Sequence, residues 1–355
     1  MKRTWALLAV ACSASAALGA CTCEQPETRA RDSQPARLAW YGAKRDLYDG
    51  IPTLLRFAPA DEALARRVWA AFAAIGRTFN DYQRDSEVSR INAKGGPVRL
   101  AVSREMAAAL RLSLRAHALT GGAFDITVRP LRQLWKRAAA SGKPPSADAL
   151  ARVRAAIGSD KLALAGRTLS IRAAGMSLDF GGIIKGIAVD EVVRMLRAAR
   201  VRAYLVQLGG QTAVFGRSAR GRPHVIGIED PRAPPRLWTR IVDPGGGFCG
   251  ATSSNAHRAI RVGGKPYYHI LDPHSGQPAH ATLLFVSVVF RGAARCWLAD
   301  ALSTACATMQ PARALRLVER LGGDALIVRL DKSGRPVEYK SRRWNDLLYR
   351  AAPGK

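Results

Sequence analysis

Residues 283–290 read Leu-Leu-Phe-Val-Ser-Val-Val-Phe and are apolar at every position except Ser287. A strand with one face in solvent alternates apolar and polar residues, whereas an unbroken apolar run of this length is typical of a strand buried on both faces. The run therefore predicts an internal strand of a sheet.

The segments around this run supply the other predicted strands and two helices. We expect helices at residues 293–309 and 311–321, followed by a hairpin that turns at residues 331–334. Before the run, short apolar stretches predict strands at residues 203–208, 212–215, 224–229 and 237–242. Another hairpin is expected to turn at Gly263-Gly264.

The N-terminal half is predicted to be mainly helical. From Asp61 to Phe79, apolar residues recur at intervals of three and four, which gives a helix one buried face. Other elements are expected as helices at residues 103–119, 146–158 and 182–199 and as a hairpin at residues 161–172. Together they predict an α+β fold, a two-lobed single body of antiparallel sheets flanked by helices. No internal repeat is visible, and no low-complexity linker follows residue 40.

Residues 1–20 have the features of a secretory signal peptide. Two basic residues precede an apolar stretch at residues 5–18, which is shorter than the ~20 residues of a membrane-spanning helix. The stretch ends in Leu18-Gly19-Ala20-Cys21, which resembles the lipobox of bacterial lipoproteins, so we expect a lipid on Cys21. An ordinary signal peptide cut near Ala20 is the alternative. Residues 21–39 are predicted to form a flexible tether, and no other segment is long and apolar enough to span a membrane.

Four further cysteines follow Cys21, at positions 23, 249, 296 and 306. No pair has the close spacing of a zinc site, and Cys296 and Cys306 lie on one predicted helix, where they cannot share a face well. We expect buried free thiols, with one disulfide as the alternative.

The net charge suggests a polyanion-binding protein. The chain has 55 Lys and Arg against 27 Asp and Glu, a formal charge of +28. Of the basic residues 44 are arginines, and they are scattered singly rather than gathered in runs with interleaved aromatics. We therefore expect no nucleic-acid site, and a basic polyanion-binding surface protein remains an alternative function.

Residues 121–131, GGAFDITVRPL, follow a predicted helix. Paired glycines let the backbone approach a ligand, Phe124 could stack on a planar ring, and the Asp125 carboxylate could accept hydrogen bonds from ring N–H groups. The structural alternative is a helix C-cap followed by a strand.

A second glycine-rich turn, LDFGGIIKGIAVD at residues 178–190, runs into a predicted helix. Free N–H groups at the start of a helix suit phosphate, and Lys185 adds a positive charge. The turn lacks the Gly-Lys-Ser/Thr ending of a Walker loop, and a plain strand-to-helix junction is the alternative. Gly209-Gly210, after another apolar strand, forms a similar close-approach turn.

Two further stretches carry candidate catalytic and metal-binding groups. His269 leaves a predicted strand just before Asp272-Pro273, so its ring could face a cleft as a base, or it could be structural. Asp300 and Thr304 lie four apart on an apolar helix, so their oxygens share one face. A carboxylate there needs a partner or a cation, and oxygen ligands favour Mg²⁺ or Ca²⁺ over zinc. The alternative is that Asp300 bonds a neighbouring loop.

In this order and at these separations, the stretches resemble the ApbE family of FAD:protein FMN transferases, which also split FAD in the presence of Mg²⁺. The resemblance covers roughly residues 40–345, within a predicted domain at residues 40–350, and includes residues 82–92, YQRDSEVSRIN. It implies an ApbE-like α+β fold with a T-fold-like core.

The resemblance also implies a role for each matching residue. The positions that would contact FAD are Tyr82, Ala123, Phe124, Asp125, Asp179 and Lys185. The implied magnesium ligands are Asp300, Thr304 and the backbone carbonyl of Gly182. His269 would act as the base beside the pyrophosphate, and Lys185 would steady the phosphates.

The family's reaction is attack by a Thr or Ser hydroxyl of an exported electron-transport flavoprotein on the FMN phosphorus of FAD, with AMP leaving. Together with the lipobox, this implies a periplasm-facing enzyme of the bacterial cell envelope, anchored to the membrane through Cys21. An FAD-binding protein or an FAD pyrophosphatase that releases FMN and AMP is the alternative.

The chain departs from the family pattern at three places. Residues 49–52 replace a Met-Gly-Thr stretch, Gln211 replaces the Asp of Gly-Gly-Asp, and Ser254 replaces the Gly of Thr-Ser-Gly. None of these changes removes an implied metal ligand or the implied base.

Overall fold

The computed structural model describes residues 38–350 apart from residues 49, 244, 255–259 and 293. The predicted signal peptide, Cys21, Cys23 and most of the predicted tether lie outside the described residues. From Leu38 the chain forms one compact unit. In the part that the structure describes, no helix is both long and apolar enough to cross a membrane.

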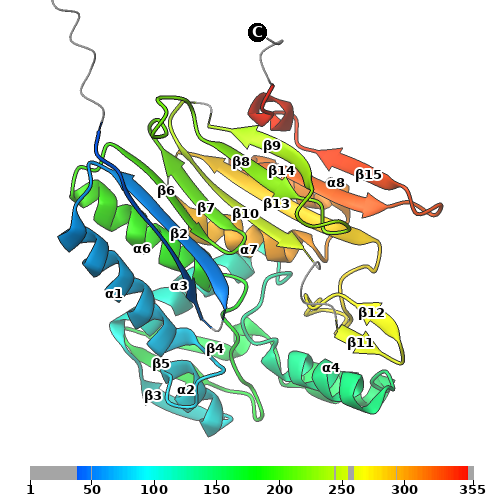
Figure 1. Cartoon of the computed structure of the whole chain (residues 1–355). Coiled ribbons are helices and arrows are strands. Elements are labelled where there is room, and N and C mark those ends of the chain that lie inside the picture. The colour runs from blue at the N-terminus through cyan, green and yellow to red at the C-terminus, as the bar shows by residue number, and fades with distance from the viewer. Residues whose placement is uncertain (1–37, 49, 244, 255–259, 293, 351–355) are drawn as a thin grey trace, which may run out of the picture. The chain divides into compact units, whose positions relative to one another are not determined.

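An eight-stranded antiparallel sheet lies at the centre of this unit, in the order β1-β2-β6-β7-β10-β13-β14-β15 (Figure 1). β13 (Leu283–Arg291) is buried at every residue but the last, which confirms the internal strand predicted from the apolar run. The other strands are β1 (Tyr41–Leu47), β2 (Ile51–Ala58), β6 (Ala203–Leu208), β7 (Gln211–Phe215), β10 (Phe248–Ser254), β14 (Asp324–Leu330) and β15 (Pro336–Lys340).

Both faces of the sheet are covered. On one face α6 (Ile184–Ala198) contacts β6 and β7, and α7 (Cys296–Cys306) contacts β10 and β13. On the other face the hairpin of β8 (Val225–Glu229) and β9 (Leu237–Val242) buries apolar side chains against the sheet. This two-sided cover is the reason that β13 can be almost entirely apolar.

Further helices and two small sheets complete the unit, and the two small sheets lie in its lower part in Figure 1. The helices are α1 (Glu62–Phe79), α2 (Glu87–Lys94), α3 (Arg104–Thr120), α4 (Arg129–Ser141), α5 (Ala147–Ala155) and α8 (Pro311–Arg320). The small sheets are β3 (Val98–Ala101), β5 (Thr168–Ile171) and β4 (Leu162–Ala165) in that order, and β11 (Ile260–Val262) with β12 (Lys265–Tyr267). The predicted hairpins at residues 161–172, 263–264 and 331–334 are therefore confirmed.

Six helices and strands were absent from the sequence prediction: β1, β2, α2, β3, α4 and β10. The strand considered as an alternative after Gly122 is wrong, because turns lead from there into α4. Pro130 lies in the first turn of α4, where its missing N–H removes no helical hydrogen bond. β10 is extended because it pairs with both β7 and β13, although Gly250 and two serines make its sequence look like a loop.

The cysteines also depart from expectation. Cys249 of β10 and Cys296 at the start of α7 form a disulfide, so the prediction of free thiols is wrong for these two. Their partnership joins segments 47 residues apart, which spacing on one helix could not reveal. Cys306 is a buried free thiol, and its burial raises the pKa to about 12.

Candidate active site

Helices α6 and α7 bring the predicted magnesium ligands together. Asp300 is 2% exposed, and its carboxylate accepts a hydrogen bond from the Gly186 N–H at 3.0 Å. One turn along α7, Thr304 Oγ1 lies 3.5 Å from the carbonyl oxygen of Gly182. The structure thus puts the hydroxyl and the carbonyl in contact, with the carboxylate one helical turn away. A carbonyl, a carboxylate and a hydroxyl are a donor set that suits Mg²⁺.

The Asp300 carboxylate has compensating partners in the protein itself. Lys185 Nζ lies 3.2 Å from Asp300 Oδ1 and also donates to the Gly181 carbonyl at 2.8 Å. Every residue of α7 but Trp297 and Thr304 is buried, so a carboxylate without partners there would be strongly unfavourable. The alternative that Asp300 bonds a neighbouring segment therefore holds too, and that segment is the start of α6.

The glycine-rich turn is held in place by side chains from distant segments. Asn92 donates to the Leu178 carbonyl at 2.9 Å and accepts from the Leu178 N–H at 2.6 Å. The Asp179 N–H donates to the Ile126 carbonyl at 2.7 Å, and its carboxylate accepts from the Gly181 N–H at 2.8 Å. The stretches around residues 92, 126 and 179 therefore meet at one place, as the resemblance of all three to the ApbE family implies.

Phe124 lies behind the predicted metal ligands. The ring is 3% exposed, and a Cβ added to Gly182 would come within 3.2 Å of it and within 3.0 Å of Thr304 Oγ1. Gly182 is therefore closely packed, and a side chain there would force Phe124 or Thr304 to shift by a few tenths of an ångström. The expected free stacking face on Phe124 is wrong, because its ring forms an inner wall of the site.

Asp125 is also built into the protein rather than presented to a ligand. Its Oδ1 accepts from Thr127 N and Oγ1 and from Ser159 Oγ, all at 2.7–2.8 Å. Its Oδ2 accepts from Ser159 N at 2.9 Å and lies 3.1 Å from His117 Nδ1. Burial opposes ionisation, but the hydrogen bonds from His117, Thr127 and Ser159 outweigh it and lower the Asp125 pKa. Both oxygens are already occupied, which corrects the expectation that they accept from ring N–H groups.

Tyr82 offers an open aromatic face. It is 69% exposed, and the Arg132 guanidinium lies 5.8 Å from its ring centroid. Arg132 also pairs with Asp179 at 3.2 Å and with Asp81. Arg132 thus connects Tyr82 to the glycine-rich turn. Sequence reasoning missed Arg132 because it overlooked α4, although Leu131, Trp135 and Ala138 recur at the three- and four-residue spacing of a helix.

His269 is half-buried and stacks on the Tyr268 ring, with centroids 5.5 Å apart. The Tyr268 hydroxyl donates to the Ser253 carbonyl at 3.4 Å, and Ser253 Oγ lies 2.8 Å from Ser303 Oγ on α7. His269 is therefore connected to the helix of Asp300 through two intermediate residues, Tyr268 and Ser253. In the same stretch, His274 Nε2 lies 3.1 Å from the Gly121 carbonyl, so this loop packs on residues 121–131.

The Gly209-Gly210 turn has a structural cause. A Cβ on Gly210 would come within 2.5 Å of the Thr252 carbonyl oxygen, and Gly209 has a φ of +56°. The close approach that the paired glycines suggested is thus to β10. Gln211 is fully buried, and its amide has no hydrogen-bond partner among the described residues.

Comparison with known proteins places this geometry in a family. The sequence pattern of the ApbE family matches residues 47–327. This chain belongs to the ApbE family. A FAD:protein FMN transferase of Vibrio cholerae is 29% identical over 84% of this chain and 86% of that protein. The FAD:protein FMN transferase of Treponema pallidum is 31% identical over 70% and 72%.

Solved ApbE structures share the fold. The apo crystal structure of the Pseudomonas stutzeri flavinyl transferase ApbE has a TM-score of 0.74 and 28% identity, over 88% of this chain and 98% of that one. The Vibrio cholerae flavin transferase ApbE has a TM-score of 0.73 and 26% identity, over 87% and 99%. The expected ApbE-like α+β fold is confirmed.

Proposed function

We propose that this chain is a FAD:protein FMN transferase that uses Mg²⁺. The observation that carries the proposal is the meeting of Gly182, Lys185, Asp300 and Thr304 at the α6–α7 contact, because this contact combines three kinds of oxygen donor with one ammonium group. Bound there, Mg²⁺ would neutralise charge on the pyrophosphate of FAD.

Three side chains of the protein would bind FAD or move the proton in this reaction. The Lys185 ammonium would hold a phosphate oxygen, and the exposed Tyr82 ring would stack on a flat ring system of FAD. His269 would accept the proton of an acceptor Thr or Ser hydroxyl as its oxygen bonds to the FMN phosphorus and the bond to AMP breaks. The products are FMN in phosphoester linkage to the acceptor, and AMP.

Labelling of a candidate acceptor tests this function. The purified chain is incubated with FAD, Mg²⁺ and an exported electron-transport flavoprotein, and flavin fluorescence is read on the denatured acceptor. Covalent fluorescence that depends on Mg²⁺ is expected. Release of FMN and AMP without labelled protein would instead establish the pyrophosphatase alternative.

His269→Ala should bind FAD normally but transfer FMN about 10²–10⁴-fold more slowly, the usual contribution of a general base. His274→Ala is the matched control, because this imidazole lies on the same loop and its side chain is 61% exposed. Equal transfer rates in the two variants would refute a role for His269 as base.

We also propose that the enzyme is lipid-anchored through Cys21 and faces the periplasm, where exported acceptors are found. The lipobox-like residues 18–21 support this. Expressed in a bacterium from its full coding sequence, the protein should partition into detergent with the membrane fraction. Cys21→Ala should move it to the soluble fraction, and unchanged partition would exclude lipidation at this residue.

A further inference from the structure

Three matched contacts link α6 and the turn before it to α7. Gly182 meets Thr304, Gly186 bonds to Asp300, and Asp190 bonds to Cys296. Along each segment the contacts recur every four residues, or about one helical turn, and in opposite directions. The predicted metal ligands occupy the first two contacts. The third contact lies outside the proposed chemistry.

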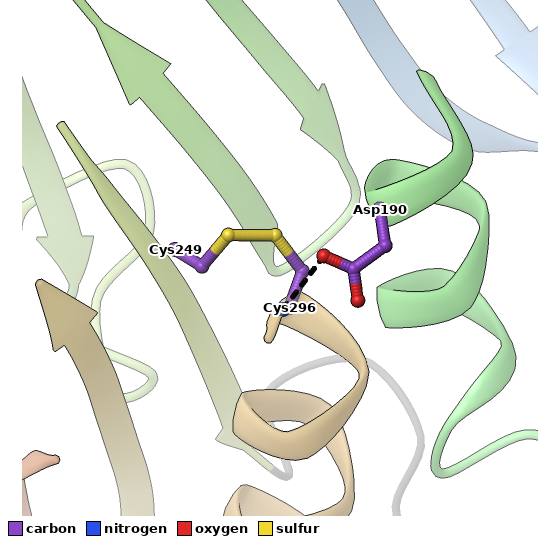
Figure 2. A group of neighbouring side chains, drawn as sticks. All are labelled: Asp190, Cys249 and Cys296. Atoms are coloured by element: carbon purple, nitrogen blue, oxygen red, sulfur yellow. Dashed lines mark hydrogen bonds between the residues drawn. A yellow bond between two sulfur atoms is a disulfide. The ribbon is translucent and has the colours of Figure 1, made fainter. Parts of the chain in front are cut away.

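Asp190 supplies the cap that α7 lacks. The residue before the helix, Arg295, has a φ of 78° and makes no side-chain capping bond. Instead the Asp190 carboxylate accepts from the Cys296 N–H at 2.9 Å (Figure 2) and from the Trp297 N–H at 2.8 Å. These are the first two N–H groups of α7. These donors have no partner within their own helix, so a carboxylate from α6 fixes where α7 begins.

The disulfide then fixes α7 to the sheet. Cys296 is bonded to Cys249 in β10, and Figure 2 shows the sulfur pair bridging strand and helix beside Asp190. Two turns further along, Ser303 Oγ lies 2.8 Å from Ser253 Oγ at the other end of β10. The Asp300 carboxylate lies between these attachments. A Cβ on Gly186 would come within 2.4 Å of the Cys296 carbonyl oxygen, so the two helices also touch here.

An alternative role for Asp190, Cys249 and Cys296 is a metal site. One ligand atom from each of Asp190, Cys249 and Cys296 lies within 4.8 Å of the others. Both carboxylate oxygens already accept backbone hydrogen bonds, however, and the sulfurs are bonded to each other. The geometry therefore favours a mechanical role.

We infer that the Cys249–Cys296 disulfide and Asp190 are positioning residues for the proposed magnesium site, so that the oxidised protein binds its metal more tightly than the reduced one. The inference rests on the proposed function. Reduction by dithiothreitol would cleave the sulfur–sulfur bond, give two thiols and convert the reagent to its cyclic disulfide. The start of α7 would then be held to β10 by packing alone, and Asp300 and Thr304 would be less firmly aligned with Gly182.

A metal titration tests the inference on the full chain. Mn²⁺ replaces Mg²⁺ as a probe for oxygen ligands, and electron paramagnetic resonance of the free ion gives its Kd in the presence of FAD. We expect the Kd to rise about tenfold in the Cys249→Ala/Cys296→Ala variant and in reduced wild-type protein, as when outer support of a metal ligand is lost. Cys306→Ala is the matched control, since it removes a buried thiol from the same helix and leaves the disulfide intact.

Several results would overturn the inference. An unchanged Kd in the double variant and in the reduced protein would show that the disulfide contributes only to folding stability, as would a lowered thermal midpoint with the same metal affinity. Thiol alkylation of the untreated protein at both cysteines would show that the disulfide does not form. Zn²⁺ binding by the reduced protein with full FAD cleavage would favour a metal site.

If the double variant does not fold, hydrogen exchange of the wild-type protein tests the inference instead. Hydrogen exchange of the Cys296 and Trp297 amides should accelerate when the wild-type protein is reduced, and unchanged exchange would contradict the inference. Failure of the proposed function is distinguishable, because the oxidised wild type would then neither bind Mn²⁺ nor cleave FAD. If the wild type does both and the reduced protein matches it, only the positioning role is wrong.

Discussion

Replacing Asp300 with asparagine should separate the chemistry of the site from the stability of the fold. Asparagine keeps the side-chain shape and an oxygen for the Gly186 N–H at 3.0 Å. The change removes the negative charge 3.2 Å from Lys185 Nζ, but this ammonium also donates to Gly181, and its side chain is 23% exposed. We therefore expect the free energy of unfolding of the metal-free protein to fall by only about 1–2 kcal/mol.

The effect on FAD cleavage should be much larger. Without the carboxylate only neutral oxygens remain to hold the cation, and loss of one such electrostatic contact lowers kcat by about 10²–10³-fold. FMN release is measured across a Mg²⁺ titration, with urea unfolding of the same preparation. A kcat for Asp300→Asn within about tenfold of wild type at saturating Mg²⁺ would refute the assignment of Asp300 as a metal ligand.

Three further changes probe the neighbouring contacts. Asp125→Asn turns an amide NH₂ toward donors that its carboxylate now satisfies, so urea unfolding should show a loss of about 3 kcal/mol while FAD affinity of the folded protein is unchanged. The hydrogen bond to the Asp125 carboxylate raises the pKa of His117, although burial of the imidazole opposes this rise. The protonated imidazole therefore stabilises the fold at pH values below the unfolded-state pKa, and this stabilisation is lost as pH rises through the folded-state pKa. Wild type should therefore exceed His117→Gln in unfolding free energy by more at about pH 5.5 than at about pH 8.5, with equal differences contradicting the pair. Tyr82→Ala, at a 69% exposed position, should leave the thermal midpoint unchanged and raise the KM for FAD about tenfold, whereas an unchanged KM would exclude stacking.

Local patterns predicted the parts of the site that depend on neighbours in sequence. Asp300 and Thr304 share a face because they are four apart on a helix. Ser103 begins the helix predicted at residues 103–119, and its hydroxyl caps α3 by accepting from the Met106 N–H at 3.0 Å. The prediction for Asp125 was wrong because it depends on partners that are distant in sequence. Its Ser159 partner lies 34 residues away, and no local pattern shows that both of its oxygens are occupied.

The role of Asp190 also depends on a distant segment that local sequence patterns do not reveal. It ends the quoted stretch at residues 178–190, yet its partners begin 106 residues later, and only the folded chain reveals that it caps α7. The spacing of four that links Gly182, Gly186 and Asp190 was visible in the sequence, as was the spacing of Cys296, Asp300 and Thr304. What the sequence lacked was the antiparallel pairing of the two sets. Because each contact lies about one helical turn from the next, a shift at the disulfide would be carried along α7 to the metal ligands. Metal affinity is therefore the sensitive measure of the positioning role of Asp190 and the disulfide.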